Sequence, residues 1–74
     1  MSKMIAQFLL TPARLLDIAE RNAKKSGTEI GVEIHPIGNG HICGVVGETL
    51  AVMLLIGAVA AEGEDALFKA EMMS

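Results

Sequence analysis

Three side chains of the kinds that bind metal ions lie close together in the middle of the sequence: His35, His41 and Cys43. Imidazole nitrogens and thiolates are ligands that zinc and other transition metals prefer. The spacing H-x5-H-x-C would let the three groups converge across a hairpin, and a ring of copies would multiply them. It matches no standard zinc pattern, however, and His and Cys are common in strands. We therefore expect no metal site, and these three residues are the only candidates for one.

The sequence shows no pattern typical of an enzyme. No nucleophile, base and acid form a recognisable constellation, because the Ser and Thr residues after Ser2 fall at element boundaries, where capping or loop roles explain them. Gly38-x-Gly40 is not followed by the helix that a phosphate-binding loop requires. We expect a protein without catalytic residues and without a cofactor.

The stretch Gly38-Asn39-Gly40-His41 is the central feature of the chain. Asn-Gly between alternating hydrophobic residues predicts a tight hairpin turn, because both residues tolerate positive φ. One interpretation is a plain turn. The other is a pore: around a rotation axis, Gly38, Asn39, Gly40 and His41 would line an opening, with backbone N–H groups free of side-chain bulk. Asn39 would then set its diameter, and His41 would make it sensitive to pH.

The elements before this turn form one strand–helix–strand half. Residues 3–10 predict a short buried strand, which Thr11-Pro12 ends. Thr11 is the expected N-cap of a helix that begins at Pro12, with an Asp17–Arg21 pair on its polar side and Gly27 after its end. Alternating hydrophobicity over residues 28–37 predicts a half-buried strand, which Pro36 brings to its end.

The elements after the turn form a second half of the same kind. We expect a return strand over residues 41–46, a break at 47–49 and a helix over 50–62 with Thr49 as its N-cap and Gly63 after its end. This helix is apolar all round, so it needs cover on several sides. Residues 66–73 predict a last strand. We expect Met53, Met72 and Met73 to fill the core.

The order strand–helix–strand–strand–helix–strand predicts an α+β fold of the ferredoxin-like βαββαβ plan. In it a four-stranded antiparallel sheet carries two helices on one face. Residues 1–74 leave room for a single domain.

Composition limits the classes of function. The chain has 74 residues, 51% of them hydrophobic, which is more apolar surface than so small a domain can bury alone, so we expect association with other copies. A net charge of −3 without a basic stripe argues against nucleic-acid binding. The apolar run over residues 50–61 is too short for a membrane span, and one cysteine without a secretory signal favours the cytoplasm.

From Thr11 to about Ala61 the chain resembles the bacterial microcompartment (BMC) shell domain. That family has a helix ending in Lys, a strand, a K-I-G-S-G turn, a strand, an R-G-D-type helix start and a small-residue helix. Here the corresponding stretches are Lys25, Ile37-Gly38-Asn39-Gly40, Gly47-Glu48-Thr49 and residues 51–61, without a gap. The chain departs from the pattern at Leu9-Leu10, where the family has Glu-Thr, and at Pro36, where the family has a basic residue.

The resemblance implies a structural protein of a bacterial microcompartment shell. It implies a disc-shaped cyclic homohexamer that tiles with other shell proteins in the cytoplasm, with Gly38, Asn39, Gly40 and His41 around a small pore for metabolites. Lys25 would lie at the assembly edge. Some members of the family hold an iron–sulfur cluster at the axis, but this chain lacks the Gly-Cys turn that such a cluster uses. Two alternatives stay open: a small oligomeric ligand- or metal-sensing protein of the same fold, and a regulatory domain that binds a partner through its exposed sheet.

Overall fold

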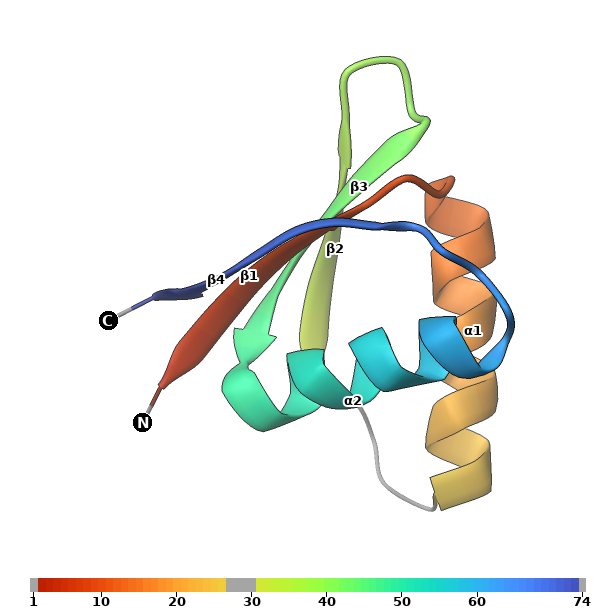
Figure 1. Ribbon diagram of the computed structural model, residues 1–74, viewed down its shortest axis with the longest axis vertical. Coiled ribbons are helices and arrows are strands. Elements are labelled where there is room, and N and C mark those ends of the chain that lie inside the picture. Colours follow the sequence, from red (N-terminus) through yellow and green to blue (C-terminus); the bar gives the residue numbers. More distant parts are fainter. Residues whose placement is uncertain (1, 27–30, 74) are drawn as a thin grey trace.

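A computed structural model describes residues 2–26 and 31–73 of the chain. Its elements follow the predicted order. They are β1 (Lys3–Phe8), α1 (Pro12–Ser26), β2 (Val32–Ile37), β3 (Ile42–Glu48), α2 (Thr49–Ala61) and β4 (Leu67–Met73) (Figure 1). The strand predicted over residues 28–37 is observed from Val32 onward, and positions 28–30 lie outside the described residues.

The four strands form one antiparallel sheet in the order β2-β3-β1-β4. β1 lies in the middle, between β3 and β4, so each strand–helix–strand half contributes one central and one edge strand. Both helices cover the same face of the sheet, and their axes cross in Figure 1. This is the ferredoxin-like α+β fold, so the predicted fold class is confirmed.

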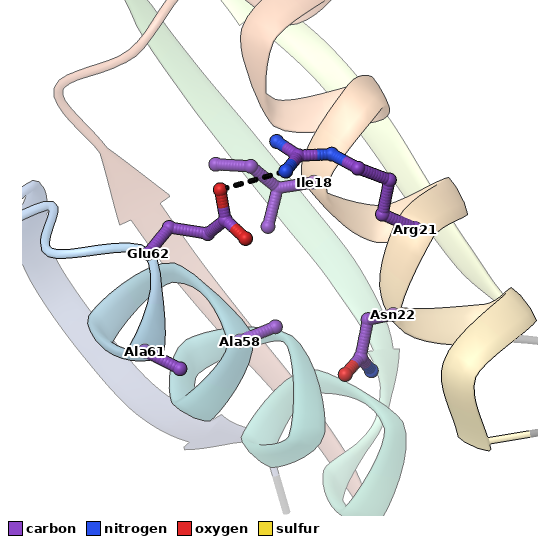
Figure 2. A pocket seen from close by; sticks show the side chains of 6 residues that line it. All are labelled: Ile18, Arg21, Asn22, Ala58, Ala61 and Glu62. Carbon is purple, nitrogen blue, oxygen red and sulfur yellow. Dashed lines mark ion pairs between the residues drawn. The ribbon is translucent and has the colours of Figure 1, made fainter.

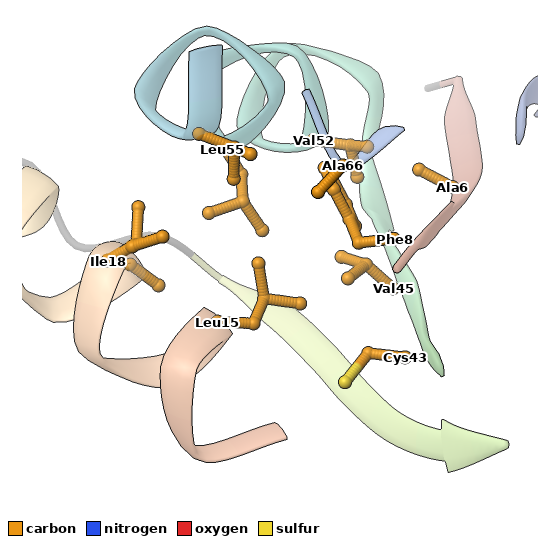
Figure 3. Packing of buried hydrophobic residues seen from close by; sticks show 11 residues of the cluster. Ala6, Phe8, Leu15, Ile18, Cys43, Val45, Val52, Leu55 and Ala66 are labelled. Atoms are coloured by element: carbon orange, nitrogen blue, oxygen red, sulfur yellow. The ribbon is translucent and has the colours of Figure 1, made fainter. Parts of the chain in front are cut away.

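The hydrophobic core fills the space between the sheet and the helices (Figure 3). Alternate residues of the central strands point into it, because successive side chains of a strand face opposite sides. The fully buried side chains from the sheet are Ala6 and Phe8 of β1 and Cys43 and Val45 of β3. Those from the helices are Leu15, Ile18, Val52, Leu55 and Val59.

The start of α1 is fixed by local chemistry, as predicted. The backbone N–H of Arg14 donates to the Thr11 side-chain oxygen at 3.3 Å, which satisfies one of the N–H groups that a first helical turn leaves without a partner. The Asp17–Arg21 pair is also present, at 3.0 Å. Gly27, predicted to follow the helix end, lies outside the described residues.

The start of α2 differs from the prediction. β3 continues through Gly47 and Glu48, because both residues pair with β1, and the helix begins directly at Thr49. Its N-cap is Glu48, which makes no side-chain capping hydrogen bond. The Thr49 hydroxyl instead lies 3.8 Å from the sulfur of Met72, so the prediction of Thr49 as N-cap is wrong. The far end is as expected: Gly63 adopts φ +80° just after the helix.

No helix within residues 2–26 or 31–73 is long and apolar enough to cross a membrane.

Candidate functional site: the central turn and an exposed apolar surface

The turn between β2 and β3 is closed by a backbone hydrogen bond. The Gly40 N–H donates to the Ile37 carbonyl at 3.3 Å, and Ile37 pairs with Ile42 across the hairpin. Positive φ occurs at Gly38 (+65°) and Gly40 (+87°), but not at Asn39. The hairpin was therefore predicted correctly, whereas the expectation of positive φ at both Asn39 and Gly40 is wrong for Asn39. Glycine is required at positions 38 and 40 because other residues rarely adopt these φ values.

The turn projects from one end of the sheet (Figure 1). In Figure 1 it extends beyond the ends of the other strands, away from α2 and from both termini. A Cβ atom at Gly38 or Gly40 would meet nothing within 4 Å. Asn39 and His41 are exposed. The four predicted pore residues thus form one continuous loop, in which Gly38, Asn39 and His41 are exposed and Gly40 is half-buried, and which presents backbone groups, an amide and an imidazole to its surroundings.

The three candidate metal ligands do not come together. His35 pairs with Gly44 on the sheet face away from the helices, with its Nε2 3.6 Å from a Glu33 carboxylate oxygen. Cys43 points to the opposite face, into the core, where its thiol donates to the Leu10 carbonyl at 3.1 Å. Burial raises the pKa of this thiol, which makes it a poor source of thiolate. His41 stands apart from both, in the exposed turn.

A wider search of the described ranges gives the same picture. Within residues 2–26 and 31–73 no three His, Cys, Asp or Glu side chains are grouped as a metal ion would require. Lys25, the predicted assembly-edge residue, lies in the last turn of α1, and its side chain is outside what the structure describes.

The outer side of α2 is exposed and almost wholly apolar. Leu50, Met53 and Leu54 keep 70%, 55% and 43% of their surface exposed, and Gly57 continues the same side of the helix. We define the apolar surface as these four positions together with two exposed residues of β4, Phe68 and Met72.

Three methionines that were expected in the core lie on the outside of the chain. Met53, Met72 and Met73 are all exposed, so the prediction that they fill the core is wrong. α2 buries Val52, Leu55 and Val59 and packs Ile56 and Ala58 partly against the core, which leaves Leu50, Met53 and Leu54 without cover. The sequence indicates the α2 part of the apolar surface, because residues 50–61 are apolar on all sides of the helix and one chain can cover only some of them.

A hollow of about 210 Å³ lies between the two helices, lined by Ile18, Arg21, Asn22, Ala58, Ala61 and Glu62 (Figure 2). Its two charged groups already bind each other: the Arg21 guanidinium lies 2.9 Å from a Glu62 carboxylate oxygen. Desolvation lowers the pKa of Arg21, but its hydrogen bond with Glu62 and the charge of Asp17 outweigh this and raise it. A second ion pair, Arg14–Glu64 at 3.1 Å, spans from α1 to the segment after α2. These pairs join the helices and leave neither charge of the hollow available to a ligand.

Comparison of the chain with protein-family models, with curated proteins and with solved structures gives no match.

Proposed function

We propose that this chain is the subunit of a self-assembling structural protein, a cyclic homohexameric shell tile of the bacterial microcompartment type. The observation that carries the proposal is the α2 part of the apolar surface, Leu50, Met53, Leu54 and Gly57. Soluble monomers rarely expose contiguous apolar patches of this kind, and such patches mark interaction sites. Within residues 2–26 and 31–73 the core contains eleven buried hydrophobic residues, yet Leu50, Met53 and Leu54 of one helix face remain uncovered.

The free energy available from covering this surface is large for so small a domain. Burying a Leu or Met side chain fully is worth about 1.5–3 kcal/mol, so Leu50, Met53 and Leu54 together offer several kcal/mol per subunit. A cyclic assembly gives each subunit two neighbours, and it closes without leaving a free patch. Gly57 and the alanines of α2 make the helix thin, which allows a neighbour to approach closely.

The central turn supplies the second part of the proposal. A loop that extends clear of its own subunit is able to meet its symmetry copies at an axis. Gly38 and Gly40 would then leave the opening narrow but unobstructed, and their backbone N–H groups suit polar or anionic metabolites. Asn39 and His41 would project from the rim. The order of elements around the turn is the one that the resemblance to the shell domain implies, and the same resemblance places the assembly in a cytoplasmic shell with other shell proteins and Lys25 at its edge.

Subunit counting with an α2 variant tests the assembly. Leu54→Lys places a charge on the apolar surface at a position already 43% exposed, so the single chain should keep its fold. We expect light scattering after size exclusion to give six chain masses, or a multiple of six where β4 edges also pair, for the unchanged protein and a species of fewer than six chains for the variant. Leu16→Lys is the matched control, because Leu16 is 49% exposed on α1, outside the apolar surface. A stable monomer or dimer of the unchanged chain refutes the ring.

The turn is tested separately with Asn39→Phe. Asn39 is exposed and has no positive φ, so the larger side chain fits without strain. If the turn lines a pore, the variant keeps the mass of the unchanged assembly and narrows the opening in electron-microscopy class averages. Loss of assembly would instead place the turn in a packing contact between subunits.

A further inference from the structure

The two edges of the sheet differ in how they are protected against pairing with another chain. Edge strand β2 contains Pro36, which has no N–H to donate to a ladder. Edge strand β4 has seven residues, Leu67–Met73, without Pro or Gly, and every one of them is exposed. Its pairing with β1 shifts register at Phe68, but residues 69–73 pair regularly. β4 is therefore the edge that is able to accept a further strand.

The charges of β4 are arranged symmetrically about its middle. Lys69 and Glu71 lie on either side of Ala70, on the sheet face away from the helices, and their side chains form an ion pair of 2.8 Å. The hydrogen bond to Glu71 raises the pKa of Lys69. Apolar residues flank the charges on both sides, Leu67 and Phe68 before them and Met72 and Met73 after them.

We propose that β4 pairs antiparallel with β4 of a second copy of this chain, about a two-fold axis at Ala70, which joins the two sheets into one of eight strands. In this register Lys69 of each copy lies opposite Glu71 of the other. Opposite charges placed directly across a strand pair are stabilising, and the two-fold axis makes the contact twice. The proposal does not depend on the pore or on the ring.

The charges select this register from its neighbours. A two-fold axis perpendicular to a continuous sheet keeps the helices of both copies on one side, so residues paired across it must share a face. The register centred on Lys69 would place two lysines opposite each other, and the register centred on Glu71 would place two glutamates opposite each other. Like charges directly opposite are destabilising, so only the register centred on Ala70 satisfies both charges.

The face of β4 toward the helices adds apolar contacts in the same register. Ala70 pairs with the buried Ala6, and Met72, two residues further, reaches the start of α2 at Thr49. Met72 is 58% exposed, and pairing of the two edges would bring it beside the second copy. Phe68 lies where the pairing of β4 with β1 shifts its register, so it has no place among the regular pairs.

Two charge-reversal variants test the proposal without relying on the ion pair within one chain. Lys69→Glu and Glu71→Lys each place like charges opposite one another in a pair of identical copies. A mixed pair of the two variants restores both opposite-charge contacts, although neither chain keeps its internal ion pair. Each variant is purified separately, and tagged Lys69→Glu chain is incubated with untagged Lys69→Glu or untagged Glu71→Lys chain.

We expect the tagged chain to retain about ten-fold more Glu71→Lys than Lys69→Glu chain at low ionic strength, and the difference to shrink in high salt. If tagged and untagged chains met only by exchanging subunits within a ring, the tagged chain would retain both untagged variants equally. Ring exchange therefore cannot account for a preference for the Glu71→Lys chain. The double variant Lys69→Glu/Glu71→Lys exchanges the two charges within one chain, so it restores the ion pair inside the chain and the two ion pairs between copies. Tagged double variant should therefore retain untagged double variant as well as the unchanged chain retains its own untagged copy. Equal retention of the two single variants overturns the proposal, and so does an unchanged chain that fails to retain its untagged copy.

Discussion

Two glycine-to-alanine substitutions should change stability in opposite directions, because their surroundings differ. Gly57 lies in the middle of α2, where a Cβ would meet nothing within 4 Å beyond its own stretch of helix. Glycine in a helix interior costs about 0.8–1.0 kcal/mol relative to alanine, so Gly57→Ala should stabilise the single chain by about that amount. For a domain of this size, 1 kcal/mol corresponds to a rise of about 4–8 °C in the melting temperature.

Gly47 gives the opposite result. A Cβ there would lie 2.9 Å from the carbonyl oxygen of Gly31, directly before β2, and 2.9 Å from a methyl carbon of Val32, the first residue of β2. The carbonyl is backbone and cannot rotate away, so the strands must separate locally. Overpacking of this kind costs about 1–3 kcal/mol, and Gly47→Ala should lower the melting temperature by several degrees or more.

The assay is thermal unfolding followed by circular dichroism, in two backgrounds. In Leu54→Lys chains, Gly57→Ala should raise the melting temperature and Gly47→Ala should lower it. In the unchanged chain the added methyl at Gly57 would stand in the proposed subunit contact, so Gly57→Ala should reduce assembly although it stabilises the helix. A Gly57→Ala chain that melts lower in the Leu54→Lys background would refute the account of α2 as a helix with an open outer side.

Three further expectations follow from individual contacts. Thr11→Ala removes the capping bond to Arg14 and should lower the free energy of unfolding in urea by about 1 kcal/mol, with Thr11→Ser as a control that keeps it. Burial raises the pKa of the Cys43 thiol above its ordinary 9.0, so the folded chain keeps the thiol proton to a higher pH than the unfolded chain does. The free energy of unfolding should therefore be unaffected by the titration of this thiol below pH 9 and should fall as the pH rises above 9. In Cys43→Ala this fall should be smaller, as measured by urea unfolding at several pH values. Glu62→Gln removes the carboxylate that pairs with Arg21 at 2.9 Å and with Arg14 at 3.8 Å; because these are surface ion pairs, the midpoint of unfolding in urea should stay almost unchanged, and a clear fall would mean that they are more than surface contacts.

The elements that the sequence predicted well are those whose signals are local. Thr11 and Pro12 specify the start of α1 through one side-chain oxygen and one fixed φ, and neither depends on tertiary contacts. Gly63 ends α2 for a similarly local reason, its positive φ. With those two helices placed, the fold class followed from the order of the elements.

The details that failed depend on contacts between distant residues. Thr49 has a capping side chain at a plausible position, but β3 pairs with β1 as far as Glu48, and this pairing fixes the helix start one residue earlier. His35 and Cys43 were candidates to converge across the hairpin, yet their side chains lie on opposite faces of the sheet. Pro36 and not His35 pairs with Cys43, and this register depends on the hydrogen bonds between two strands, which the spacing of the residues alone does not specify.

The exposed methionines show why hydrophobic content alone does not locate a core. Met53 and Met72 are apolar, as Phe8 is, but only one face of the sheet and one side of α2 form the core. Ala6, Phe8 and the other core residues fill the positions on that face and that side, and Met53 and Met72 remain exposed. The remaining apolar side chains can lie only on the outside of a single chain, where they are gathered on one helix side and one strand edge. An apolar excess scattered over the surface would require no partner, whereas one gathered on α2 and along β4 gives identical copies two separate places to meet. For this reason the ring contact and the edge contact are tested with different variants, Leu54→Lys for the first and reversal of Lys69 or Glu71 for the second.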